Sequence, residues 1–255
     1  MYTYKDRRRP VVTDGSPRVV RLTGVLDRAG VDRVRDALLA RLWQRPGPVI
    51  VDLSALRAAG PEVRAVVDDV HRAVADWPAA GLLVIDPSGA VGPDGPVHPS
   101  DSAGPGAPVH PSLDRALAAL ANAPAAVLAA DLPPVVTAAQ QARALVTDGC
   151  GRWGVPALVD PARIAVTELV NNAVAHAGTS MTVRVAPRGS SLHLAVRDRC
   201  ARPPAYAGLD PFTSVGGRGL LLVDTVARRW GSTPLPDGKV VWCVLHAEDE
   251  TARLG

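Results

Sequence analysis

The stretch TELVNNAVAHAG, residues 167–178, combines an apolar pattern with polar side chains at a regular spacing. Glu168, Asn172 and His176 are each four residues apart, so they drift by only about 80° around an α-helix. The other residues are mostly Ala, Val and Leu, which predicts a buried helix with one polar edge. Such an edge either faces solvent or lines a pocket, and the stretch taken alone favours solvent.

Two later features favour a pocket. Asp198 ends the alternating stretch LHLAVRD, and GGRGLLLV (216–223) brings glycines directly before an apolar helix. A carboxylate at the end of a strand can accept a hydrogen bond from an exocyclic amine. Glycines before a helix let backbone N–H groups approach a phosphate. The order of polar helix, strand ending in Asp, and glycine loop into helix therefore indicates a nucleotide site.

With these motifs, residues 131–247 resemble the GHKL ATP-binding fold, and within it the anti-sigma factor serine kinases of Gram-positive bacteria. ELVNNAVAH is similar to the N-box of that group, Asp198 stands at the position of its adenine-binding aspartate, and GGRGLLLVDTVARRWG (216–231) is similar to its glycine box and following helix. The resemblance implies ATP as ligand and Mg²⁺ as cofactor.

The resemblance also implies a role for each matched residue. Asn172 would give its amide oxygen to a Mg²⁺ held among the ATP phosphates, because Mg²⁺ takes few protein ligands. Glu168 would be the catalytic base for an attacking hydroxyl. Asp198 would accept the adenine amine. For His176, a structural hydrogen bond and a catalytic role both stay open.

The glycine box implies a phosphate-side loop formed by Gly217 and Gly219, with Arg218 between them either on a phosphate or in solvent. The next box departs from the family pattern, because Asp-x-Gly is replaced by Asp198-Arg199-Cys200. This replacement predicts weaker nucleotide binding. We interpret Cys200 as a small space-filling residue.

The first half, residues 11–122, resembles the STAS domain of the antagonists that such kinases phosphorylate. VIVDLSAL (49–56) and VHPSLDRALAAL (109–120) carry the resemblance. Where the family has its phosphoacceptor serine, this chain has Ala58 and Ala59, and we interpret Ser54 as structural. This half is therefore expected to be a docking surface, a pseudosubstrate or an internal regulator that accepts no phosphate.

The pattern of strands and helices predicts an α/β fold class: a STAS-like α/β domain (11–122), a linker (123–130), and a GHKL (Bergerat) sandwich of helices on a mixed sheet (131–250). The Pro-, Gly- and Ser-rich segment 87–111 is expected to be loop. We expect strands at 18–26, 48–55, 81–87 and 239–247, a hairpin of 181–187 with 191–198, and helices at 31–44, 61–77, 112–122, 135–153, 161–177 and from about 220.

Composition excludes several classes of protein. The 255 residues carry a formal net charge of +3, and the one basic run lies at residues 5–9, so no direct nucleic-acid partner is expected. Cys150, Cys200 and Cys243 are widely spaced without a CxxC motif, which predicts neither disulfides nor a zinc site. No apolar stretch suggests a signal peptide or membrane span, and we expect a cytoplasmic protein.

Two functions stay open at this point. The first is an ATP- and Mg²⁺-dependent serine/threonine protein kinase that regulates sigma factor signalling by phosphorylating a separate STAS antagonist. The resemblance allows a sigma factor as a further partner and a homodimer as the assembly. The second is a non-catalytic, nucleotide-dependent switch that binds the same partners. Glu168 favours the kinase, whereas Cys200 and the absence of the acceptor serine favour the switch.

Overall fold

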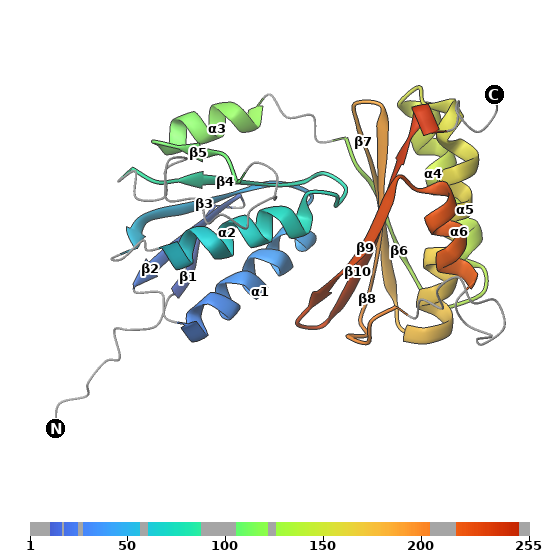
Figure 1. Ribbon diagram of the computed structural model, residues 1–255, viewed down its shortest axis with the longest axis horizontal. Helices are drawn as coiled ribbons and strands as arrows, with labels where there is room; N and C mark the ends of the chain where they lie inside the picture. Colours follow the sequence, from blue (N-terminus) through green and yellow to red (C-terminus); the bar gives the residue numbers. More distant parts are fainter. Residues whose placement is uncertain are drawn as a thin grey trace. The chain divides into compact units, whose positions relative to one another are not determined.

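The computed structural model of the chain describes residues 11–16, 18–24, 28–56, 61–87, 106–121, 126–204 and 218–249 (Figure 1). The chain divides into two compact units: one is Met1–Ala75 with Ala80–Ala125, and the other is Ala126–Gly255 with Asp76–Ala79. Each unit has its own five-stranded sheet. Among the described residues, no helix is both long enough and apolar enough to cross a bilayer.

The first unit alternates strands with helices. Its elements are β1 (Val11–Ser16), β2 (Val19–Gly24), α1 (Arg28–Gln44), β3 (Gly47–Leu56), α2 (Pro61–Val74), β4 (Ala80–Ile85), β5 (Val109–His110) and α3 (Leu113–Ala121). The strand order follows the sequence, from β1 to β5. The pair β1 and β2 is antiparallel, and the other three pairs are parallel. For β2 with β3 and for β3 with β4, parallel pairing follows from the crossover helices α1 and α2, which return the chain to the same end of the sheet.

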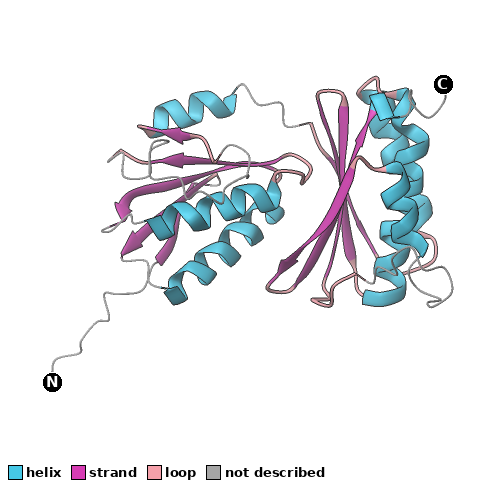
Figure 2. Cartoon of the chain, viewed as in Figure 1, coloured by secondary structure: helices cyan, strands magenta, loops and turns pink. Residues whose placement is uncertain are grey.

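Helices cover both faces of this first sheet, which explains why β3 is apolar along most of its length. On one face, Ala116 and Leu120 of α3 pack against Val19, Ile50 and Ile85. Helices α1 and α2 contact each other and β3 and β4, and Figure 2 shows them on the opposite face. The central strand is therefore buried on both sides.

Three expectations for this half need correction. Val109–His110, at the end of the segment 87–111 that was expected to be loop, form β5 and pair with β4. Residues 11–16 form β1, paired antiparallel with β2, a strand that was not expected because only two apolar residues precede the polar TDGS. The helix at 61–77 ends earlier, at Val74. The predicted acceptor positions Ala58 and Ala59 lie outside the described residues, as does most of the segment 87–111.

In the described residues of the second unit, the helices lie against one face of a single sheet (Figure 1). Its elements are β6 (Leu128–Leu132), α4 (Ala138–Arg152), a 3₁₀ turn (Pro156–Leu158), α5 (Val159–Asn172), a π-helical turn (Ala173–Ala177), β7 (Met181–Arg188), β8 (Ser191–Asp198), α6 (Arg218–Val226), β9 (Arg229–Leu235) and β10 (Gly238–His246). The strand order is β6-β7-β8-β10-β9. Every neighbouring pair is antiparallel.

The core of this unit follows from the alternation of side chains along its strands. Every second residue of β7, β8 and β10 packs in one cluster with the apolar stripes of α4, α5 and α6. The strand residues of this cluster are Met181, Val183, Val185, Leu192, Leu194, Val196, Val241, Cys243 and Leu245. One face of the sheet is thus the floor on which the helices lie.

The α/β fold class is confirmed, with differences in detail. The sheet of the second unit is antiparallel rather than mixed. The predicted linker 123–130 includes the first residues of β6, which pairs with β7. Residues 229–235 form β9, although the sequence RWGSTPL carries few apolar residues and its first three residues were included in the predicted glycine box and following helix (216–231).

The three cysteines differ in their surroundings. Cys150 and Cys243 are buried, and burial raises the pKa of the Cys150 thiol to about 11 and that of the Cys243 thiol to about 12. Cys200 is half-buried. The thiolate is the reactive form of cysteine. The two buried cysteines are therefore expected to react slowly, because reagents reach them poorly and only a small fraction is thiolate.

We therefore expect one fast-reacting thiol in the native protein. Iodoacetamide at pH 8 should modify Cys200 well before Cys150 and Cys243, and all three should react in denaturing urea. Peptide mass spectrometry at successive times measures the order. Native Cys200→Ser protein should react slowly, and labelling of this variant at the parental rate would contradict the assignment.

Candidate functional site

The polar edge of α5 consists of two side chains one helical turn apart. Glu168 and Asn172 are half-buried, whereas Leu169 and Val170 between them point into the core and Asn171 is exposed. Residues at this spacing have Cβ atoms about 5–6 Å apart. Within the described part of the chain, neither the Glu168 carboxylate nor the Asn172 amide has a hydrogen-bond or ion-pair partner. The edge thus carries two polar groups that can still form hydrogen bonds or bind a ligand.

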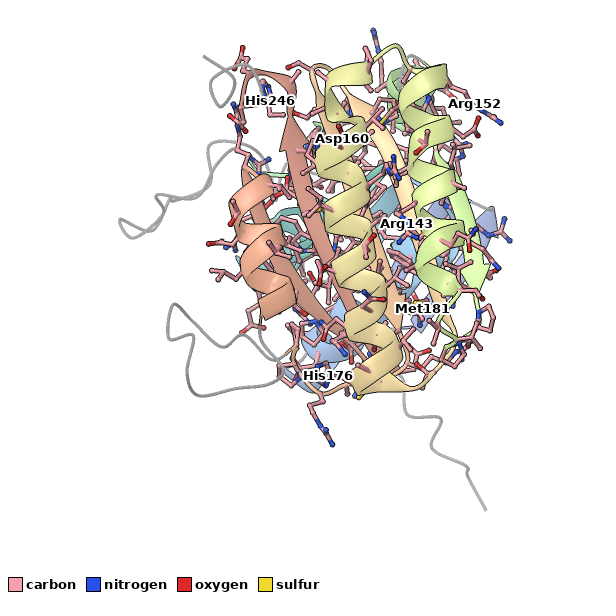
Figure 3. The ribbon with its side chains drawn as sticks, turned by 90° about the vertical axis from the view of Figure 1, so that its right-hand side faces the viewer. Arg143, Arg152, Asp160, His176, Met181 and His246 are labelled. Carbon is pink, nitrogen blue, oxygen red and sulfur yellow. The ribbon has the colours of Figure 1, made fainter. Side chains whose placement is uncertain are left out.

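The helix changes its geometry directly after this pair. Residues Ala173–Ala177 form a π-helical turn that ends at Gly178, whose φ of 60° is left-handed and whose N–H donates to the Ala173 carbonyl at 3.0 Å. His176 is exposed in this turn, and Figure 3 shows it at the opposite end of the helix from Asp160. Because the α-helical spacing stops at Asn172, the predicted row of three polar residues is reduced to two.

Helix α6 begins against the Glu168 side chain. A Cβ atom on Gly219 would lie 2.5 Å from Glu168 Oε2, so only a glycine fits there without moving the carboxylate. This contact supplies a physical reason for one glycine of the GGRG stretch. Arg218 is the first residue of α6, but its side chain and Gly217 lie outside the described part of the chain.

Asp198 forms a buried ion pair with Lys239. The two residues are Cα partners across β8 and β10. Asp198 continues the core-facing row of β8 after Val196, and Lys239 precedes Val241 in the core-facing row of β10. The Lys239 Nζ lies 2.8 Å from Asp198 Oδ2, and the side chains of Lys239 and Asp198 are only 5% and 3% exposed. Both charges are thus at the end of the layer between sheet and helices.

The backbone of Cys200 completes this arrangement. Its N–H donates to Asp198 Oδ1 at 2.8 Å, and its carbonyl accepts from Lys239 Nζ at 3.1 Å. Both bonds use the backbone, so the change from the glycine of the family pattern to cysteine does not remove them. The expected weakening of the site by Cys200 therefore has no basis in these hydrogen bonds.

Lys239 was missed in the sequence analysis. Two features of the sequence could have drawn attention to it. Lys5 and Lys239 are the only lysines in the sequence, and Lys239 begins the otherwise apolar strand KVVWCVLHA. A charged residue at the start of an apolar strand usually indicates an exposed strand end. The register with Asp198 places it in the interior instead.

Three further contacts hold the end of β8 in place. Arg197 donates to both carboxylate oxygens of Asp237, at 2.6 and 2.7 Å. The N–H of Arg199 donates to Thr179 Oγ1 at 3.1 Å, which links β8 to the segment that follows α5. Gly238 has a φ of 150°, and a Cβ there would meet the Asp198 carbonyl oxygen and lie 2.8 Å from the Arg199 Cα. The ends of α5 and β8 and the starts of α6 and β10 therefore belong to one region.

The two parts of this region differ in their fit to a magnesium nucleotide. The described residues contain no group of three His, Cys, Asp or Glu side chains that could hold a metal alone. Mg²⁺ usually binds one or two protein oxygens, and its other ligands are phosphate oxygens and water. The Asn172 amide oxygen, which has no partner among the described residues, fits this use, and the Glu168 carboxylate one turn away stays available as a proton acceptor. The Asp198 carboxylate is paired with Lys239, so it is less available to accept a hydrogen bond from the amine of adenine.

One comparison with known proteins falls on the second unit. Residues 132–245 match the histidine kinase-like ATPase domain family, a type of domain that implies ATP binding. Among solved structures, the RsbU and RsbW domains of Rv1364c from Mycobacterium tuberculosis are similar over 49% of this chain, with 19% identity and a TM-score of 0.38. The chain covers 33% of that protein chain. No curated protein matches the sequence.

The close approach at Gly238 leads to a stability prediction. Gly238→Ala should lower the free energy of unfolding by about 1–3 kcal/mol or more, because alanine is strained at this φ and its Cβ would clash with β8. Gly151→Ala is the matched control, since Gly151 is exposed in α4 and a Cβ atom there would have no neighbour within 4 Å. It should be neutral or stabilising by up to about 1 kcal/mol. Urea unfolding measures both, and equal stability of the two variants would contradict the packing described.

Proposed function

We propose that the second unit is an ATP- and Mg²⁺-dependent serine/threonine protein kinase of the anti-sigma factor type, which phosphorylates a STAS-domain antagonist in trans. The observation that carries the proposal is the polar edge of α5. Glu168 and Asn172 lie half-buried, one turn apart and without a partner among the described residues, and Glu168 lies beside the start of α6. The match to the ATPase family supports the same assignment.

Each residue of this edge has a distinct role in the proposed reaction. The acceptor hydroxyl oxygen attacks the γ-phosphorus, its proton passes to the Glu168 carboxylate, and the bond to the bridging oxygen breaks with its electron pair leaving on ADP. The Asn172 amide oxygen is the protein ligand for Mg²⁺, which neutralises phosphate charge. Gly219 keeps the space beside Glu168 free of a side chain.

The first unit is proposed to be a STAS-like docking or regulatory domain that accepts no phosphate. Ser54 is exposed near the end of β3, and its N–H donates to Asp52 Oδ1 at 3.0 Å. Asp52 in turn accepts from Arg21 Nε at 2.9 Å. These contacts support a structural role for this strand end. A cytoplasmic location, a sigma factor as a further partner and a homodimer belong to the same proposal.

A non-catalytic switch is the alternative. The observation that favours it is the sequence of the first half, which has Ala58 and Ala59 where the family has its phosphoacceptor serine. A switch needs nucleotide-dependent binding of a partner but no proton acceptor at position 168. The two functions therefore differ in what Glu168 does.

The magnesium assignment predicts a loss of nucleotide binding in Asn172→Ala. Affinity for Mg·ADP, measured by calorimetry on the full chain, should fall by about tenfold or more, the size of one charge-assisted contact. Asn171→Ala is the control, since Asn171 is the exposed neighbour of the same residue type. Equal affinities for the Asn172→Ala and Asn171→Ala proteins would refute the metal role.

The catalytic assignment predicts a loss of turnover without a loss of nucleotide in Glu168→Ala. Phosphate transfer to a serine-bearing STAS protein from the same cell should fall by about 10²–10⁴-fold, the usual contribution of a general base. Glu168→Gln, which keeps the shape, should be similarly impaired, and both variants should bind Mg·ATP nearly as the parent does.

The acceptor protein with alanine in place of its serine sets the background for this assay. On the switch alternative, the parent transfers no phosphate, and partner binding is the same with and without Glu168. Absence of transfer by the parent to any STAS protein that it binds would decide for the switch.

A further inference from the structure

We propose that Lys239 determines nucleobase selectivity in the second unit. Its ammonium occupies the carboxylate that the ATP site would use for adenine, so the parent protein should discriminate only weakly between adenine and 6-oxopurine nucleotides. The inference rests on the proposed nucleotide site. It concerns a residue that neither the motif nor the proposed reaction uses.

The position of Lys239 follows from the sheet. Asp198 and Lys239 are the end positions of two adjacent core-facing rows, and they are paired directly across β8 and β10. Their charged atoms are 2.8 Å apart and both side chains are almost completely buried. The pair is therefore a fixed part of the interior, unlike a mobile surface ion pair.

A neutral ligand amine cannot replace the ammonium on Asp198. Removing one partner from a buried ion pair leaves the other charge without compensation, which costs far more than a neutral hydrogen bond gains. Asp198 Oδ1 already accepts from the Cys200 N–H. An adenine amine would therefore have to share a carboxylate whose charge is already neutralised by Lys239.

Lys239 also adds a hydrogen-bond donor to this end of the layer. An ammonium has three N–H donors. Two are used, on Asp198 Oδ2 and on the Cys200 carbonyl, and the third has no partner among the described residues. Adenine presents an amine donor at position 6, whereas guanine presents a carbonyl acceptor. A site that offers both a carboxylate and an ammonium can satisfy either base.

The surrounding contacts oppose a rearrangement that would release Asp198. The Arg197 Nη2, which donates to both carboxylate oxygens of Asp237, ties β8 to the turn before β10. Gly238 brings the backbone of β10 against the Asp198 carbonyl. Strand β10 therefore cannot move Lys239 away from Asp198 without breaking these contacts.

The test compares base selectivity in the parent and in Lys239→Thr. Threonine keeps a donor for Asp198 but removes the charge and shortens the side chain. Calorimetry on the full chain with Mg·ATP, Mg·GTP and Mg·ITP gives the affinity ratios, where ITP carries a carbonyl oxygen in place of the adenine amine. We expect comparable affinities in the parent and a rise of about tenfold or more in ATP preference in Lys239→Thr, as one discriminating base contact gives.

Folding of the variants is checked by urea unfolding. The double variant Asp198→Asn with Lys239→Met removes both charges, so it leaves no unpaired buried ion; it should fold and bind without preferring ATP. If Lys239→Thr does not fold, the affinity ratios of the parent still decide, because a strong preference for ATP in the parent would contradict the role of Lys239. A purely structural ion pair would alter the stability of Lys239→Thr but not its base preference.

The outcomes separate this inference from the proposed function. Strong preference of the parent for ATP over ITP and GTP would overturn the role of Lys239 and leave the kinase proposal standing. An unchanged ratio in folded Lys239→Thr would do the same. If neither the parent nor any variant binds a nucleotide, both proposals fail.

Discussion

The pairing register of β8 with β10 is the constraint on which the second unit depends. Side chains alternate between the two faces of a sheet. A slip of one residue in the pairing would therefore move the apolar side chains of the slipped strand from the core face to the opposite face. The observed register directs two apolar rows toward the helices and brings Asp198 opposite Lys239 at the end of those rows. The ion pair is thus a consequence of the same alternation that builds the core, and Gly238 permits the close approach that it requires.

The helix layer contributes the other half of the region. Helix α5 is anchored by Leu169 and Val170 in the core, and this anchoring turns Glu168 toward Gly219 at the start of α6, with Asn172 one turn further along the helix. Two partly buried polar groups without partners do not favour folding by themselves. The free-energy cost of burying them is offset where a ligand forms hydrogen bonds with them. Polar groups without partners are therefore expected at functional sites more than elsewhere.

Local patterns in the sequence were sufficient for most of the helices, for the hairpin of β7 and β8 and for the polar edge of α5. They were not sufficient for β6 and β9, because these strands are short or poor in apolar residues and are defined by their partners in the sheet. Lys239 was missed for a related reason. Its burial depends on pairing with a residue 41 positions earlier, since 239 minus 198 is 41, and no periodicity reports such a pairing. The predicted roles of Asp198, Gly217 and Arg218 came from the family resemblance and remain proposals.

The π-helical turn after Asn172 has a consequence for the length of the chain. A π-turn contains one residue more than the α-helical turn it replaces. The segment from Ala173 to Met181 leads from the polar edge to β7, and on the way Thr179 accepts a hydrogen bond from Arg199. Deleting one alanine would allow a regular helix but would rotate and shorten this connection. In relatives of this unit, insertions and deletions should therefore be tolerated less in this segment than in the turn between β7 and β8.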